Sequence, residues 1–188
     1  MGADMLAQAF ASTAGVLAGV DAQQLDGATP CASWQVRELI NHVVGGTFFF
    51  AVTVETGVAP ARGDETDFCA GDFVTEFNRG AARALTAFEA DGAMDKTLTL
   101  PFAELPGSVF INIATIDTFT HGWDLARATG QPTDLDPELA AALLGFAQAF
   151  LSDAMRGSDG ASPFGAQVEA PAGATPADQL AAFLGRHV

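Results

Sequence analysis

One stretch of the chain concentrates residues that could do chemistry: Asp117, His121 and Asp124. Asp117 and His121 are four residues apart, so on a helix their side chains project to the same place. At helical periodicity they share a stripe with Phe110 and Ile113, and this stripe begins apolar and turns polar midway. Buried polar groups need partners. These groups are therefore either satisfied inside a core or they bind something that is not protein.

His42 can complete a metal site with this pair. It lies on the apolar side of a predicted helix over residues 34–56, and a facing helix could bring it to Asp117 and His121. Two imidazoles and one carboxylate leave a coordination position open for water, a thiolate or a substrate. An open position is typical of a catalytic rather than a structural metal site. The spacing therefore favours a divalent metal at His42, Asp117 and His121.

The alternative is that these polar groups only stabilise the fold. A core histidine is more often hydrogen-bonded within the protein than bound to a metal, and Asp117 and His121 can pair with each other. Asp124 can form an ion pair with Arg127, or it can orient a ligand histidine. The remaining candidates are interpreted as core or packed residues, namely Trp34, Trp123, residues 48–50 and Cys31.

Composition limits the partners that the chain can have. Its 188 residues include Lys+Arg 8 and Asp+Glu 23, a formal net charge of -15. Such a charge repels nucleic acid and anionic lipid, so we expect neither as a partner. No apolar run is expected to cross a membrane and no secretory signal is evident, so the cytoplasm is the expected compartment. Cys31 and Cys69 occur without a CxxC motif, which argues against a disulfide framework.

Five amphipathic helices are predicted to position the candidate residues, because apolar residues recur at helical spacing in five segments. Ser33 is expected to cap the second helix, and Gly57 and Gly130 are expected to end the second and the fourth. A polar loop over residues 58–67 should follow the second helix. The predicted helices cover residues 3–20, 34–56, 68–89, 108–128 and 137–155, with a crossover and a brief extended segment in residues 91–107.

The C-terminal residues predict a wrap of irregular structure. They are rich in Gly, Pro, Ala and Ser as far as residue 176, with one short strand expected at residues 166–169. A last amphipathic helix at residues 177–185 should dock on the bundle. We therefore predict an all-α four-helix bundle with a long crossover over residues 1–156. Residues 157–188 should form a small appendage packed on the same domain.

Two stretches of the sequence resemble a known family. Residues 29–43 (TPCASWQVRELINHV) and 117–130 (DTFTHGWDLARATG) are similar to the signature stretches of actinobacterial metal-binding proteins. These proteins are related to the N-terminal domain of mycothiol-dependent maleylpyruvate isomerase, within the DinB superfamily. Residues 177–186 (ADQLAAFLGR) resemble the usual ending of the same group. The resemblance thus covers nearly the whole chain, although the middle of the chain contains no motif of this family.

This resemblance implies a DinB-type four-helix bundle that binds a divalent metal, zinc or sometimes nickel. In the family, a histidine of the second helix and a carboxylate and histidine of a later helix hold the ion. Carried over to this chain, these residues are His42, Asp117 and His121. They are the same three residues that the spacing favours.

The resemblance also implies a function. The family's thiol-dependent enzymes use the metal to hold a low-molecular-weight thiol, mycothiol, as the nucleophilic thiolate. We therefore expect a mycothiol-dependent transferase or an isomerase-like enzyme, with mycothiol as cosubstrate and an electrophilic small molecule as substrate. Asp124 or Thr120 would support the site.

Two departures from the family pattern limit this expectation. The isomerase has a glutamate where this chain has Asp117, whose side chain is shorter by one methylene. It also has a larger C-terminal domain that contributes to the substrate site, and residues 157–188 are too few to contain that domain. We therefore do not expect maleylpyruvate isomerisation itself.

Two other functions remain open. The first is a non-catalytic metal-binding bundle that acts as a binding or stress-associated dimer. The second is a non-haem iron enzyme, because two histidines and a carboxylate with open positions also suit iron. The exposed faces of a bundle do not fix its oligomeric state, so a homodimer is one of the possibilities.

Overall fold

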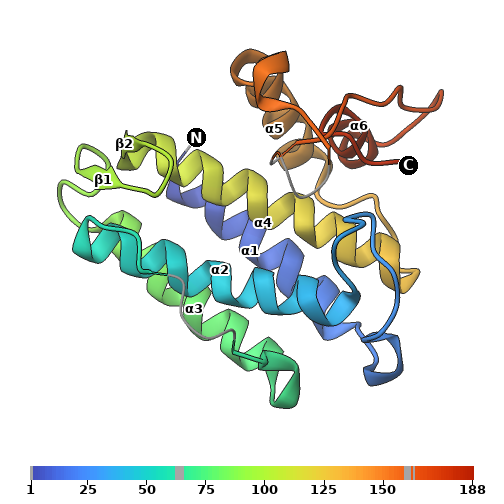
Figure 1. Cartoon of the computed structure of the whole chain (residues 1–188), viewed down its shortest axis with the longest axis horizontal. Coiled ribbons are helices and arrows are strands. Elements are labelled where there is room, and N and C mark those ends of the chain that lie inside the picture. The colour runs from blue at the N-terminus through green and yellow to red at the C-terminus, as the bar shows by residue number, and fades with distance from the viewer. Residues whose placement is uncertain (1, 62–65, 159–161, 163) are drawn as a thin grey trace.

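Four long helices form the body of the molecule, as Figure 1 shows for the computed structural model of the chain. The structure describes residues 2–61, 66–158, 162 and 164–188. The four helices are α1 (Ala3–Ala18), α2 (Val36–Thr56), α3 (Phe73–Glu89) and α4 (Gly107–Thr129). α1 packs on α4 and α2 packs on α3, and contacts of α1 with α3 and of α2 with α4 close the bundle. The predicted all-α, DinB-like bundle is confirmed.

Two further helices form the C-terminal appendage. α5 (Pro137–Phe150) and α6 (Pro176–Phe183) pack on each other. Figure 1 shows them together on one side of the bundle, beyond α4. α6 contacts α4, and α5 contacts α1. A small C-terminal appendage is present as predicted, but α5, which was expected to belong to the bundle, is part of it. The division at residue 157 stays a prediction.

The crossover between α3 and α4 contains a small hairpin. Its strands, β1 (Thr97–Thr99) and β2 (Glu104–Pro106), are antiparallel, with Leu98 opposite Leu105. The brief extended segment predicted there is confirmed. The strand predicted at residues 166–169 is wrong, because the N–H of Val168 donates to the carbonyl of Ala182 near the end of α6 rather than to a neighbouring strand.

Some helix ends differ from the prediction. α2 begins at Val36 rather than Trp34, and its cap is Gln35, not Ser33. The reason is a capping box, in which the Glu38 carboxylate accepts the N–H of Gln35 at 2.7 Å. α3 begins after its cap Asp72, because the preceding residues form a separate 3₁₀ turn, η2 (Phe68–Ala70).

The C-terminal ends of α2 and α4 agree with the prediction, whereas α5 ends earlier than the predicted residue 155. Gly57 and Gly130 end α2 and α4 in the left-handed conformation, with φ values of 85° and 70°. α5 ends at Phe150, and the residues after it form the short turn η3 (Asp153–Met155) rather than the rest of a helix. The loop predicted over residues 58–67 is described only at its ends, since residues 62–65 lie outside the described residues.

Two apolar clusters fill the interior. The first lies among α1, α2, α3 and α4. The second joins α4 to the appendage and includes Phe119 and Trp123 from α4, Leu143 from α5, and Leu180 and Leu184 from α6. α4 is therefore buried on two sides. Within the second cluster, the indole N–H of Trp123 donates to Asp178 Oδ1 at 2.9 Å.

α2 is the one described helix that is long and apolar enough to cross a membrane. By length and composition, the prediction that no apolar run could do so is wrong. However, 50% of the apolar window is buried inside the bundle. A core helix of a bundle has the same two properties, because its neighbours cover most of its apolar faces.

Candidate metal centre

The structure brings the three predicted ligands together where α2 faces α4. His42 Nε2 lies 3.5 Å from Asp117 Oδ1, and His121 Nε2 lies 3.6 Å from the same oxygen. The three candidate ligand atoms all lie within 4.8 Å of one another. Ligand atoms around a tetrahedral ion with bonds of about 2.1 Å are roughly 3.4 Å apart. The spacing therefore fits a set of ligands that share one ion, and their role as ligands stays a prediction.

One nitrogen of this group has no hydrogen-bond partner within the described residues. His42 Nε2 is buried and makes no hydrogen bond, although Asp117 lies nearby. An unsatisfied buried nitrogen is costly to the fold. An ion between His42 and Asp117 would satisfy it, and two imidazoles with one carboxylate suit zinc, nickel or iron. The residues present therefore fit a divalent metal.

The charges favour the ionised carboxylate. Burial alone would raise the pKa of Asp117, but the neighbouring His42, His121 and Arg186 outweigh burial and lower it. Burial alone would lower the pKa of His42, and the Asp117 carboxylate reverses this and raises it. Without an ion, Asp117 and His42 thus act as an ion pair. The Asp117 carboxylate is in the form that binds cations.

Asp124 contacts His121 at Nδ1, the ring nitrogen that is not a candidate ligand atom. Its Oδ2 lies 2.9 Å from His121 Nδ1, and its side chain is fully buried. Burial would raise the pKa of Asp124, but hydrogen bonding and charge from His121 and Arg186 lower it to about 2. An ionised carboxylate can only accept a hydrogen bond, so the proton of neutral His121 lies on Nδ1. The Nε2 lone pair is then free to face Asp117.

The partner of Asp124 is not the one considered from the sequence. Arg127, one turn along α4, is exposed. The cation that contacts Asp124 is Arg186, which follows α6. The interpretation of Asp124 as the residue that orients a ligand histidine agrees with the geometry. Thr120, expected to support the site, has a buried hydroxyl without a hydrogen-bond partner in the described part of the chain.

Sequence reasoning missed the place of Trp34. Its ring centroid lies 4.5 Å from that of His42 and 5.6 Å from that of His121. Trp34 is partly buried and packs against the first apolar cluster, as predicted for a core residue, but its ring also borders the two histidines. The one signal was its place in residues 29–43, the same stretch that contains His42.

Cys31 also lies in the site. Its thiol donates to Asp124 Oδ2 at 3.2 Å, and Sγ lies 3.9 Å from His121 Nδ1. Burial, reinforced by the Asp124 charge, raises the pKa of the Cys31 thiol. Cys31 is therefore a packed, protonated thiol, which agrees with the prediction that it is not a nucleophile.

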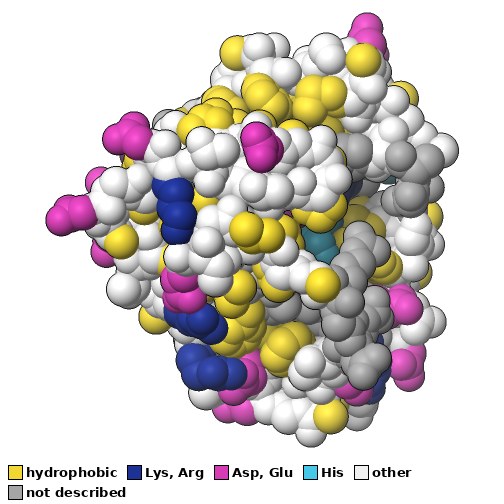
Figure 2. Space-filling model, turned by 60° about the vertical axis from the view of Figure 1, so that its left-hand side comes forward, with side chains coloured by type: hydrophobic (Ala, Val, Ile, Leu, Met, Phe, Trp, Pro, Cys, Tyr) yellow, Lys and Arg dark blue, Asp and Glu magenta, His cyan; other side chains and the backbone are white. Residues whose placement is uncertain are grey.

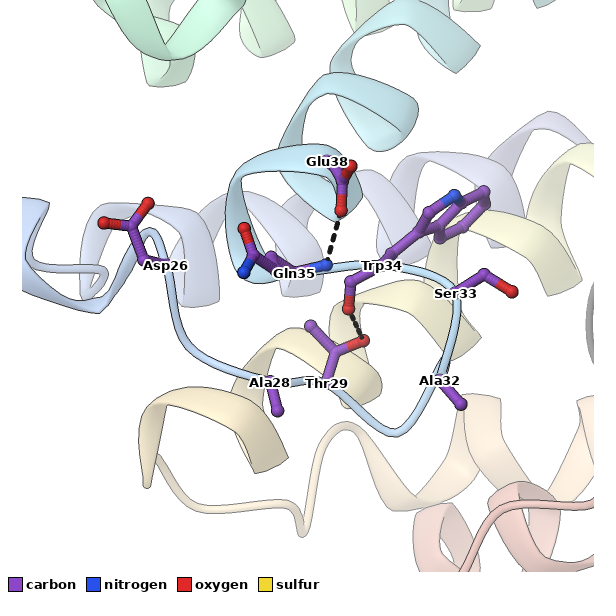
Figure 3. A pocket seen from close by; sticks show the side chains of 8 residues that line it. All are labelled: Asp26, Ala28, Thr29, Ala32, Ser33, Trp34, Gln35 and Glu38. Atoms are coloured by element: carbon purple, nitrogen blue, oxygen red, sulfur yellow. Dashed lines mark hydrogen bonds between the residues drawn. The ribbon is translucent and has the colours of Figure 1, made fainter.

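The loop before α2 presents Cys31 and Trp34 to the site. An antiparallel bridge between Ala28 and Gln35 closes its base, and the Thr29 hydroxyl lies 2.9 Å from the carbonyl of Cys31 and 2.8 Å from that of Trp34. Figure 3 shows the Trp34 indole extending away from the Gln35 side of the loop. These bonds make the loop a defined wall of the site.

The same loop lines a hollow of about 400 Å³. Several of the polar groups around it are bonded within the loop, because Thr29 bonds the carbonyl of Trp34 and Glu38 bonds the N–H of Gln35 (Figure 3). Trp34 borders both the hollow and the two histidines. Neither histidine lines the hollow, so it is distinct from the group formed by His42, Asp117 and His121.

The proposed ligands are accessible from outside. The side chains of His42 and Asp117 are 34% and 30% exposed, whereas that of His121 is 11% exposed. In Figure 2 a histidine side chain is visible at the floor of a recess between apolar side chains. The side chains of His42 and Asp117 are therefore partly exposed at the surface, while His42 Nε2 itself is buried.

A second group in the described residues, Cys31, His121 and Asp124, also has the spacing of metal ligands. Here, however, the Arg186 guanidinium already donates to both carboxylate oxygens of Asp124 and to Cys31 Sγ. A protein cation thus neutralises the Asp124 charge. Among the described residues, no Arg or Lys is hydrogen-bonded to His42, Asp117 or His121, so that group is the better candidate.

Comparisons with known proteins found one family model and two relatives that match this chain. A family model described as "Mycothiol maleylpyruvate isomerase N-terminal domain" matches residues 6–126, which include all three candidate ligands. "Uncharacterized protein Rv0738" of Mycobacterium tuberculosis strain H37Rv is 46% identical over 176 residues, which cover 93% of this chain and 92% of the relative. "Uncharacterized protein MT0763" of strain CDC 1551 / Oshkosh matches with the same identity and coverage. No solved structure gives a significant match.

Proposed function

Because the chain belongs to the family of the mycothiol maleylpyruvate isomerase N-terminal domain, we propose that it is a metal-dependent thiol transferase or isomerase-like enzyme. In this proposal His42, Asp117 and His121 bind a divalent ion, most simply zinc, and mycothiol is the cosubstrate. The observation that carries it is the approach of both Nε2 atoms to Asp117 Oδ1, at 3.5 Å and 3.6 Å.

When bound, the ion would keep a small thiol in its thiolate form at neutral pH. The protein residues have separate tasks. His42, Asp117 and His121 supply the ligand atoms, and Asp124 keeps the proton of His121 on Nδ1. Trp34 covers one side of the His42 ring.

The reaction in this proposal is a nucleophilic attack by sulfur. The thiol gives its proton to water, and its sulfur forms a bond to an electrophilic carbon of the second substrate. In a transfer the leaving group departs with the bonding electrons, and in an isomerisation the sulfur itself departs with them and the thiol is regenerated. The partly exposed His42 and Asp117 leave room for that substrate to approach.

A specific observation favours a second candidate, a non-catalytic metal-binding bundle. Asp124, Cys31 and Arg186 are bonded to one another. They are therefore not free to transfer a proton to or from a substrate. In this alternative the ion has a structural or binding role only.

Metal binding can be tested with protein purified without an affinity tag. We expect elemental analysis to find about one zinc ion per chain, and this zinc should be lost in His121→Ala. His187→Ala is the matched control, because it removes an exposed histidine of the C-terminal segment and should retain the zinc. Absence of metal above background, or equal metal content in His121→Ala, would refute the site.

The thiol can be tested separately in the cobalt-substituted protein. Mycothiol should add a sulfur-to-cobalt charge-transfer band if its sulfur occupies the open position. A spectrum that stays unchanged at saturating thiol would favour the non-catalytic bundle.

A further inference from the structure

We propose that Arg186, in the C-terminal segment, is a positioning residue for the metal ligand His121 and acts through Asp124. This inference rests on the proposed metal site. In this proposal a residue that follows α6 sets the orientation of a metal ligand on α4. Arg186 lies outside the stretch matched by the family model, which ends at residue 126.

The contact between Arg186 and Asp124 has two hydrogen bonds. Arg186 Nε lies 3.2 Å from Asp124 Oδ1, and Nη2 lies 3.1 Å from Oδ2. The arginine side chain is 12% exposed and the aspartate side chain is fully buried. Two parallel bonds between planar groups fix the plane of the carboxylate as well as its position.

The oxygen held by Arg186 is the one that holds His121. Asp124 Oδ2 accepts from Arg186 Nη2, from the Cys31 thiol and from His121 Nδ1 at 2.9 Å. Arg186 and His121 thus bond the same carboxylate, and the guanidinium fixes the direction in which Oδ2 accepts from the imidazole. Without Arg186 the carboxylate is free to rotate, and the imidazole loses its fixed direction.

The backbone at the end of α6 fixes Arg186 in turn. The N–H of Arg186 donates to the carbonyl of Ala181 at 2.9 Å, and that of Gly185 donates to Ala182 at 3.0 Å. Gly185 has a φ of 96°. These are the two bonds of a Schellman motif, in which glycine is favoured at the left-handed position. The motif therefore fixes the backbone position from which the Arg186 side chain extends.

Glycine at position 185 is required by packing as well. A Cβ built there would lie 2.6 Å from Gly165 Cα, a backbone atom that cannot move aside cheaply. Arg186 Nη1 also donates to the carbonyl of Leu184 at 3.2 Å, and Leu184 is fully buried in the second apolar cluster. The direction of Arg186 is thus set by α6 and its packing.

The first test is zinc affinity, measured by competition with a chromogenic chelator. Arg186→Gln should weaken binding by about 10- to 100-fold, the loss typical when a residue that supports a metal ligand is removed. Arg186→Lys keeps the charge but not the paired bonds, and it should recover part of the affinity. Equal affinity in wild type and Arg186→Gln would overturn the proposal.

A matched control separates positioning from support of the appendage. Arg156 also ties the appendage together, because Nη1 donates to the carbonyls of Gly165 at 3.0 Å and Phe183 at 2.7 Å. It is not one of the residues that contact Asp124. Arg156→Gln should therefore leave zinc affinity unchanged. An equal loss in Arg156→Gln would show that only the fold of the appendage matters, and would refute a positioning role for Arg186.

A double-mutant cycle tests whether Arg186 acts through Asp124. In the Asp124→Asn background, Arg186→Gln should have little further effect on zinc affinity. The double variant also removes both buried charges, so it can be studied if Arg186→Gln alone does not fold. Equal losses in the two backgrounds would show that Arg186 acts by another route.

The tautomer of His121 gives a readout that does not need metal. In metal-free wild-type protein at a pH where the ring is neutral, nitrogen NMR should show the proton on Nδ1, and Arg186→Gln should show a mixture of tautomers. If wild type binds no zinc, the proposed function fails while the tautomer still decides the role of Arg186. If wild type binds zinc and Arg186→Gln changes neither affinity nor tautomer, only this inference fails.

Discussion

At the scale of single residues, Asp117 is the group on which both imidazoles converge. Its Oδ1 is the oxygen nearest to His42 Nε2 and His121 Nε2, at 3.5 Å and 3.6 Å. Two neutral imidazoles alone would supply no negative charge to a divalent ion. The carboxylate is therefore expected to account for much of the affinity, even though it is one methylene shorter than the glutamate of the isomerase.

Asp117→Asn tests this expectation, because asparagine has nearly the same shape but no charge. Zinc affinity should fall by more than the roughly 10- to 100-fold that is typical for a residue that only supports a ligand. Chelator competition measures the change, and Asp67→Asn, which removes an exposed carboxylate paired with Arg37, serves as the control. An affinity of Asp117→Asn within a few-fold of wild type would show that Asp117 is not a ligand.

Residues on the apolar faces of predicted helices could be found from sequence, including His42 on the facing helix, but residues from loops and chain ends could not. Asp117 and His121 were predicted because a spacing of four places two side chains on one helix face. The contact of Asp124 with Arg186 spans 62 positions, and that of Asp124 with Cys31 spans 93. No periodic pattern specifies such contacts, because they depend on how a loop and the end of α6 fold back on α4.

At the scale of helices, α4 is the element that the site depends on, since it carries Asp117, His121 and Asp124. α4 approaches α1 closely at Gly122, which follows His121 in the sequence. A Cβ built at Gly122 would lie 2.5 Å from Thr13 Oγ1 and 3.4 Å from Thr13 Cα. The Thr13 hydroxyl in turn donates to the carbonyl of Thr118 at 3.0 Å. The small residue lets the two helices approach.

Gly122→Ala should therefore destabilise the protein by about 1–3 kcal/mol through overpacking, measured by chemical denaturation. Gly15→Ala is the matched control on α1, because a Cβ there meets nothing within 4 Å. That control should stabilise the protein by about 0.5–1 kcal/mol, the usual gain of alanine over glycine in a helix. Equal effects of the two substitutions would contradict the close approach.

The boundaries of the helices show the limit of periodicity. Apolar spacing located α1 and α4 almost completely, but it placed the start of α2 two residues early. Ser33 is a good cap residue by type, yet Gln35 and Glu38 make the capping box. The bridge between Ala28 and Gln35 holds the preceding residues in the loop. That pairing is a tertiary feature that a local pattern does not contain.

At the scale of the whole molecule, the appendage shares its core with the bundle. Leu180 of α6 and Trp123 of α4 belong to the same apolar cluster, and Trp123 also donates to Asp178 at 2.9 Å. We therefore propose that residues 1–156 and 157–188 fold as one unit. A separate C-terminal domain would need a core of its own.

Leu180→Ala provides the test. It should lower the free energy of unfolding by about 2–5 kcal/mol while the molecule still unfolds in one transition. Far-UV circular dichroism and tryptophan fluorescence should give the same midpoint in wild type and variant. Two separate transitions, with only the smaller one shifted by Leu180→Ala, would mean that the appendage folds independently.

Bound metal should in turn stabilise the contact between Arg186 and Asp124. Coupling free energies are reciprocal, so if the guanidinium strengthens metal binding, bound metal must strengthen the hold on the guanidinium by the same amount. Zinc should then slow hydrogen exchange at the amides of Gly185 and Arg186, which donate to the last carbonyls of α6. Exchange rates that do not respond to zinc would exclude this coupling. The end of α6 would thus report metal occupancy although no ligand lies on it.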